Sequence, residues 1–101
     1  MRSQKEVNIL DKAKCLIAAG KYLDTRHAQF RQQQRNISLV EIKYVIYNGY
    51  HEKRKDEYKS EWNAWNYAIR GRTIDHRELR VIVSVDDPIN LLIITAIDLK
   101  K

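Results

Sequence analysis

The spacing of the apolar residues changes at Gly49, and this change constrains the fold more than any other feature of the chain. Before Gly49 the apolar side chains recur every three or four residues, which is the period of a helix with one buried face. After Gly49 they alternate, which is the period of a half-buried strand. Helices followed by strands predict an α+β domain, with the helices packed on one face of a mostly antiparallel four-stranded sheet.

Three helices are predicted in the first half of the chain. Thr25 can cap the second helix, because its hydroxyl can accept a free backbone N–H of the first turn. Ser38 and Glu41 form a capping box at the start of the third helix, in which each side chain accepts one free N–H. The expected helices are 9–17 (ending before Gly20), 26–35 and 39–47, all within residues 4–48.

Four strands are predicted in the second half. The first is short and highly charged, as suits an edge strand, and the last is apolar on both faces, as suits a central strand. The expected strands are 50–55, 62–70, 79–85 and 91–99, within residues 50–99. The 101 residues have the length of a single domain, 1–101.

Alternation also sorts the strand residues between the two faces of the sheet. One face carries Trp65, Tyr67, Ile69, Val81, Val83 and Val85, and we expect the helices to cover it. The other face carries Trp62, Asn66, Arg70, Arg80 and Ser84. Such a surface suits single-stranded nucleic acid, because bases stack on aromatic rings and arginines bind phosphates. The alternative is a solvated face with one tryptophan packed under a loop.

Three basic residues line up along one face of the second predicted helix. His27, Arg31 and Arg35 are spaced i, i+4, i+8. Positive charges this close repel one another unless they face an anion, such as a phosphate, or internal carboxylates. In the alternative interpretation, His27 bonds a backbone carbonyl and the two arginines pair with acidic residues of the same chain.

A second basic group surrounds the connection between two long predicted strands. It consists of Arg70, Arg72, His76, Arg77 and Arg80. So much positive charge in one connection predicts a phosphate-binding segment. His76 is either a proton-transfer residue, because imidazole titrates near neutral pH, or an incidental loop residue. The basic residues of 51–59 alternate with acids and indicate a solvated edge, and the alternative is contact with the backbone of a nucleic acid.

Several chemistries are absent from the sequence. The chain has no phosphate-binding glycine loop, no Cys/His spacing for zinc and no Gly-x-Ser-x-Gly elbow. We therefore expect no metal and no cofactor, so that any catalysis depends on His, Arg, Lys or Tyr. The net charge of +6 favours an acidic partner. One cysteine, no apolar run of about 20 residues and no signal-peptide core predict a cytoplasmic protein without membrane contact.

Several motifs resemble, in order, those of a bacterial domain-of-unknown-function family with a Ser/Thr-x-His-Ala-x-x-Arg signature. They are Thr25-Arg26-His27-Ala28-Gln29-Phe30-Arg31, Arg35-Asn36-Ile37-Ser38, Arg70-Gly71-Arg72, Leu79-Arg80-Val81-Ile82-Val83 and Ile93-Ile94-Thr95-Ala96. The resemblance covers residues 22–99, and it departs from the family pattern after Thr95 and around residues 58–65. It implies His27, Arg31 and Arg35 as motif positions, with Arg80 and Thr95 on the matching strands.

The family is similar to the RelE/ParE-like and barnase-like group. In that group helices precede a four-stranded antiparallel sheet, and many members are toxins that cleave RNA without metal. The resemblance therefore implies the same fold and, as an expectation, the same class of activity.

Residues and resemblance together predict a small RNA-binding protein, a metal-independent ribonuclease of a toxin–antitoxin pair. His27 or His76 would move protons, and Arg31 or Arg70 would stabilise the charged transition state. The nucleic-acid-binding residues would be Arg35, Trp62, Asn66, Arg70, Arg72 and Arg80. The expected partners are RNA and a small acidic antitoxin. The alternative is a non-catalytic module that binds protein or nucleic acid.

Overall fold

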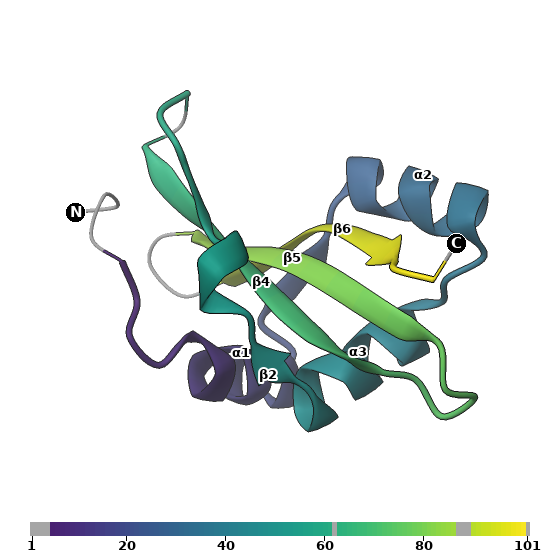
Figure 1. The fold of residues 1–101 in the computed structure, drawn as a ribbon. Helices are drawn as coiled ribbons and strands as arrows, with labels where there is room; N and C mark the ends of the chain where they lie inside the picture. Colours follow the sequence, from purple (N-terminus) through teal and green to yellow (C-terminus); the bar gives the residue numbers. More distant parts are fainter. Residues whose placement is uncertain (1–4, 62, 87–89, 101) are drawn as a thin grey trace.

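A computed structural model of the chain describes residues 5–61, 63–86 and 90–100. Within these ranges the chain forms helices α1 (Ile9–Ala18), α2 (Arg26–Arg35) and α3 (Leu39–Asn48) (Figure 1). The strands are β1 (Tyr22–Asp24), β2 (Tyr50–His51), β3 (Glu57–Lys59), β4 (Ala64–Arg72), β5 (Glu78–Asp86) and β6 (Asn90–Asp98), and η1 (Lys53–Lys55) is a short 3-10 helix. None of the helices in the described ranges has both the length and the apolar character needed to cross a bilayer.

The described strands form one mixed sheet of six. Its order is β1-β6-β5-β4-β2, and β3 pairs with the start of β4. β1 runs parallel to β6, whereas the other pairings are antiparallel. The α+β class is confirmed, but the predicted number of four strands is wrong. β1 and β3 have three residues each, too few for an alternating pattern to show in the sequence.

The predicted edge strand 50–55 is also shorter than expected, because β2 ends at His51 and the chain turns into η1. Asp56 gives the physical reason. Its Oδ1 accepts the backbone N–H of Ala68 at 3.0 Å, so a side chain takes the place of edge-strand backbone. The other carboxylate oxygen of Asp56 binds His51 Nε2 at 2.8 Å and Lys5 Nζ at 3.0 Å. Lys5 is thereby held against the sheet, and α1 begins at Ile9, as expected.

Local capping sets the ends of α2 and the start of α3, and both predictions are confirmed. Thr25 Oγ1 accepts the N–H of Ala28 at 3.1 Å, and Asn36 ends α2 in the left-handed region with φ 53°. Ser38 Oγ accepts the N–H of Glu41 at 3.1 Å, while Glu41 Oε1 accepts that of Ser38 at 2.9 Å. These bonds lie within a few residues of each helix end, so the sequence alone defines them.

The core lies between the sheet and the pair α1 and α3, on the face that alternation predicts. Its fully buried residues are Ile9, Ala13, Ile42, Val45, Ile46, Ile69, Leu79, Val81, Val83, Leu91 and Ile93. Trp65 and Val85 pack half-buried against it. α2 lies apart from this pair, alongside the C-terminal half of β6 (Figure 1). The opposite face of the sheet is therefore not covered by α1 and α3, and α2 and β3 lie along its borders.

Candidate functional site

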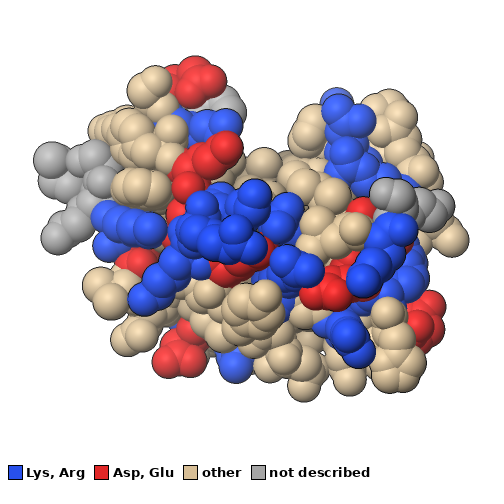
Figure 2. All heavy atoms as spheres, in the orientation of Figure 1, with Lys and Arg blue, Asp and Glu red and all other residues tan. Residues whose placement is uncertain are grey.

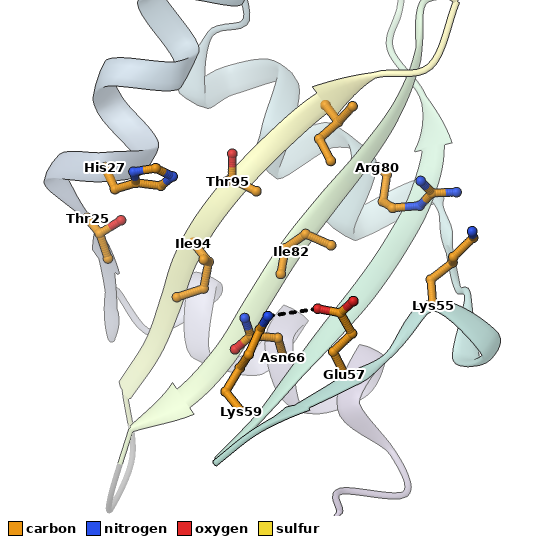
Figure 3. A pocket seen from close by; sticks show the side chains of 11 residues that line it. Thr25, His27, Lys55, Glu57, Lys59, Asn66, Arg80, Ile82, Ile94 and Thr95 are labelled. Carbon is orange, nitrogen blue, oxygen red and sulfur yellow. Dashed lines mark ion pairs between the residues drawn. The ribbon is translucent and has the colours of Figure 1, made fainter. Parts of the chain in front are cut away.

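A groove of about 740 Å³ crosses the sheet face that α1 and α3 do not cover. One wall is the start of α2, and the other is formed by η1 and β3 (Figure 3). Figure 2 shows this hollow between two raised parts of the molecule, with uncharged atoms at its bottom and Lys and Arg atoms gathered beneath it in the view. The groove is therefore apolar inside and basic along its rim.

The floor of the groove depends on an irregularity between β5 and β6. Ile82 is opposite Thr95 and Val83 is opposite Ile93, so Ile94 is an extra residue on β6. A bulge of this kind lets two successive side chains point to the same face. Ile94 and Thr95 both line the groove, where Ile82 and Ile97 complete an apolar floor (Figure 3).

Hydrogen bonds at both ends of α2 hold it against β6 and so place His27. At the start of α2, Thr25 Oγ1 donates to the carbonyl of Ile93 at 2.8 Å. At its end, Arg35 Nη1 donates to the carbonyl of Ala96 at 2.7 Å and to Thr95 Oγ1 at 3.3 Å. His27 is exposed, and its ring extends from α2 over the groove (Figure 3).

The predicted basic row on α2 therefore divides among three environments. His27 lines the groove, whereas Arg31 Nη1 donates to Gln34 Oε1 at 2.9 Å on the surface of the helix. Arg35 bonds within the molecule, as the alternative interpretation expects, although its partners are a carbonyl and a hydroxyl instead of carboxylates. The structure does not bring the three side chains to one point.

The opposite wall places an ion pair next to a buried amide. Glu57 of β3 is directly opposite Asn66 of β4, and Lys59 follows two residues later on the same face. Lys59 Nζ binds Glu57 Oε1 at 2.9 Å, and this partner raises the pKa of the lysine. Asn66 is only 6% exposed and lines the groove.

A cluster around Glu52 lies at the basic rim, and we name it the Glu52 cluster. Glu52 is 4% exposed and binds Arg80 Nε at 2.8 Å, Arg70 Nη1 at 3.2 Å and Arg54 Nη2 at 3.8 Å. Arg80, chiefly through its hydrogen bond, and Arg70 hold the pKa of Glu52 below its usual value. Arg70 also binds Glu78 at 2.7 Å. Two predicted phosphate-binding arginines, Arg70 and Arg80, thus already have carboxylate partners.

The other predicted site residues lie away from the groove. His76 is exposed in the β4–β5 turn with φ 68°, and Arg72 is exposed on β4. The base of this turn meets the end of α2, where Arg77 Nη2 donates to the carbonyl of Arg35 at 3.3 Å. Arg35 is eight positions beyond His27 on α2, about 12 Å of helix axis at 1.5 Å per residue. Trp62 lies outside the described residues.

The structure thus brings His27, Asn66 and Arg80 to one groove, together with residues that sequence reasoning did not select. Those residues are Thr25, Lys55, Glu57, Lys59, Ile82, Ile94 and Ile97. The position of Ile82 could have been predicted from the sequence, because alternation places it beside Arg80 on the face of the sheet that the helices do not cover. Lys55 and Lys59 belong to the basic segment 51–59, for which nucleic-acid contact was the alternative interpretation. Their position at the groove, and that of Glu57, depends on how β3 pairs with β4.

Among the described residues, no group of three His, Cys, Asp or Glu side chains lies close enough to hold a metal ion. The fold and site together define an α+β domain with a mixed sheet and an open groove walled by a helix and a short strand. The chain belongs to the family of the domain of unknown function DUF4258, whose model matches residues 25–98. That match runs from the cap of α2 to the end of β6 and so includes the whole groove. No curated protein and no solved structure matches the chain significantly.

Proposed function

We propose that the groove binds single-stranded RNA, and that the protein is a small RNA-binding protein of the toxin type. The observation that supports this most is the combination of an apolar floor with a basic rim on one open sheet face. RNA has apolar base faces and a charged backbone, so one strand can use both surfaces at once. In this proposal bases lie on Ile82, Ile94 and Ile97, and phosphates meet the lysines of the rim.

Lys55 is the rim residue on which the proposal is most directly tested. It lines the groove, is exposed and forms no ion pair within the described residues. Replacing Lys55 by Ala should weaken binding of a labelled single-stranded RNA of about 10 nucleotides about fivefold, whatever its sequence. Lys14→Ala removes the same charge from α1, which packs on the face of the sheet opposite the groove, and should leave binding unchanged. Equal affinities of the two variants would contradict the groove as the binding site.

A metal-independent ribonuclease activity is a second proposal, favoured by the position of His27. Its ring is the one imidazole among the described residues that lines the groove. As a general base, His27 would take the proton of an RNA 2′-hydroxyl. The 2′-oxygen then bonds to phosphorus, the bond from phosphorus to the 5′-oxygen breaks, and water returns a proton to that oxygen.

This activity is tested by incubating purified protein with total RNA in EDTA and following fragment length. His27→Ala should reduce cleavage at least about 100-fold, the usual contribution of a general base. His76→Ala, in the β4–β5 turn, should not reduce it. Intact RNA with the wild-type protein, together with measurable RNA binding, would favour the non-catalytic module instead.

The toxin-type proposal includes an acidic protein partner. An antitoxin with a negatively charged segment would fit over the rim lysines and the Glu52 cluster and would block the groove. We also propose, from the motifs, that the fold is related to RelE/ParE-like toxins. If the protein inhibits growth, co-expression of a small acidic protein encoded by a neighbouring gene should restore it.

A further inference from the structure

Asn66 carries a hydrogen-bonding capacity that the protein does not use. Within the described part of the chain, its Oδ1 is the one buried side-chain oxygen or nitrogen without a hydrogen-bond partner. A buried acceptor without a donor destabilises the folded state, and so such groups call for a reason. The neighbouring buried hydroxyl of Ser84, by contrast, donates to the carbonyl of Trp65 at 2.8 Å.

The surroundings of Asn66 indicate where a donor would come from. The side chain lines the groove and lies beside the apolar floor, with Ile82 on the same face of the sheet (Figure 3). On its other side, the Glu57–Lys59 ion pair stands next to it on β3. Glu57 is 67% exposed and Lys59 is 34% exposed in their side chains, so water screens this pair and an anion can replace it.

We propose that Asn66 is the base-reading residue of the groove and that it selects a base with an exocyclic amino group beside a ring-nitrogen acceptor, as in adenine. This inference rests on the proposed binding of RNA. A phosphate near the rim draws Lys59 away from Glu57, and this movement uncovers the Asn66 amide. Asn66 Oδ1 then accepts a hydrogen bond from the exocyclic amino group of the base, while Nδ2 donates to the adjacent ring nitrogen. Asn and adenine are complementary in this way, and the ring of the base lies on Ile82.

The test compares two tetranucleotides that differ only in the group that Asn66 would read. One is built from adenosine and the other from purine riboside, which has the same ring nitrogens, charge and stacking surface but no amino group. The wild-type protein should bind the adenosine tetranucleotide about tenfold more tightly, as expected for one well-formed amide–base contact. Asn66→Leu, with a side chain of similar size and no polar atom, should bind the two equally.

A second variant tests the role of the ion pair. Glu57→Gln removes the partner of Lys59, so both tetranucleotides should bind more tightly while the preference for adenosine persists. An unchanged affinity would contradict the opening step.

The possible failures are distinguishable from one another. Equal binding of the two tetranucleotides by the wild-type protein would overturn base reading and leave the RNA groove standing. A preference that survives in Asn66→Leu would assign the reading to another residue. No binding of either tetranucleotide, or of longer RNA, would overturn the proposed function and this inference together. The wild-type comparison decides whether the groove reads the amino group even if Asn66→Leu fails to fold.

Discussion

Arg77 ties together three elements that are far apart in the chain. From the base of the β4–β5 turn, its Nη1 donates to the carbonyl of Asn36 at 2.9 Å and binds Glu41 Oε2 at 3.2 Å. Its Nη2 binds Asp98 Oδ2 at 3.3 Å and donates to the carbonyl of Arg35. A guanidinium can bind all of these acceptors because its N–H donors point in several directions within one plane. Although its neighbours in the sequence suggest phosphate binding, Arg77 holds the end of α2 in place.

Replacing Arg77 should therefore lower the stability of the fold more than it weakens the binding of a ligand. Arg77→Ala should lower the free energy of unfolding by about 2–4 kcal/mol, because it leaves Asp98 and Glu41 without their shared partner. Arg77→Lys should recover less than half of that loss, because one ammonium cannot reach all four acceptors. Urea unfolding measures both variants. Full recovery by lysine would show that charge alone matters here.

Glu52 makes stability depend on pH in a direction that the structure defines. Its pKa in the folded protein lies below the usual value of 4.5, chiefly because Arg80 hydrogen-bonds to it. A lowered pKa contributes stability that is complete above 4.5 and is lost as the pH falls through the folded value. Unfolding free energy should therefore decrease in acid.

Glu52→Gln isolates this contribution from that of other acids. At pH 7 the variant should be less stable than the wild type by about 1.5–3 kcal/mol, the range for a charge-assisted hydrogen bond. The difference should shrink as the pH is lowered below 4.5, because the wild-type carboxylate becomes neutral too. Thermal unfolding at pH 7 and at acid pH measures it. A difference that does not change with pH would contradict the ionic role of Glu52.

At the scale of elements, β1 and α2 share one edge of β6. β1 pairs with the first part of β6, through Tyr22 opposite Leu91, and α2 lies against the second part through Arg35. The sequence predicts α2 closely because its cap at Thr25 is local. It does not predict β1, because a strand of three residues is defined only by its partner. The bulge at Ile94, which shapes the groove floor, is likewise a property of two paired strands.

The junction between α3 and β2 depends on a close approach of two backbones. A Cβ on Gly49 would meet the carbonyl oxygens of Val45, at 2.6 Å, and of Arg70. Gly49→Ala should therefore lower the free energy of unfolding by about 2–3 kcal/mol, as overpacking does. Gly20 offers a control, because its φ is +74° but a Cβ added there would meet no atom within 4 Å.

In that control, Gly20→Ala should cost only about 1–2 kcal/mol, which is the penalty for the left-handed conformation. Gly20→Asn should cost less than that, because asparagine adopts this conformation more easily than alanine. If Gly49→Ala were as stable as Gly20→Asn in urea unfolding, the backbone contact between α3 and β4 would be looser than described.

At the scale of the whole molecule, only some of the side chains behind the net charge of +6 are free to bind an anionic ligand. Arg70, Arg77 and Arg80 have carboxylate partners, so much of the predicted phosphate-binding group serves the fold. Composition predicts an acidic ligand, but it cannot say which cations are already paired. The basic residues of η1, predicted as a solvated edge, are all exposed, and Lys55 lines the groove. Arg54 lies 3.8 Å from the Glu52 carboxylate.

Salt dependence should report how many of these cations meet phosphates. Replacing Lys53, Arg54 and Lys55 together by Ala should reduce the slope of log affinity for single-stranded RNA against log salt by about 2, or roughly 0.7 for each lost contact. A triple variant at Lys14, Lys21 and Lys100 changes the net charge equally and should keep the slope. Equal slopes for both triple variants would mean that RNA responds to total charge and not to this rim.

The parallel pairing of β1 with β6 also determines when, during synthesis of the chain, the groove can form. Tyr22 leaves the ribosome 69 positions before its partner Leu91, an interval of about 3–14 seconds at about 5–20 residues per second. Until β6 emerges, α2 has no strand to lie against, and the groove cannot form. A chain stalled before residue 90 should be cut readily by protease, whereas a chain that includes β6 should resist. The two walls and the floor of the groove therefore come together only after β6 has been made.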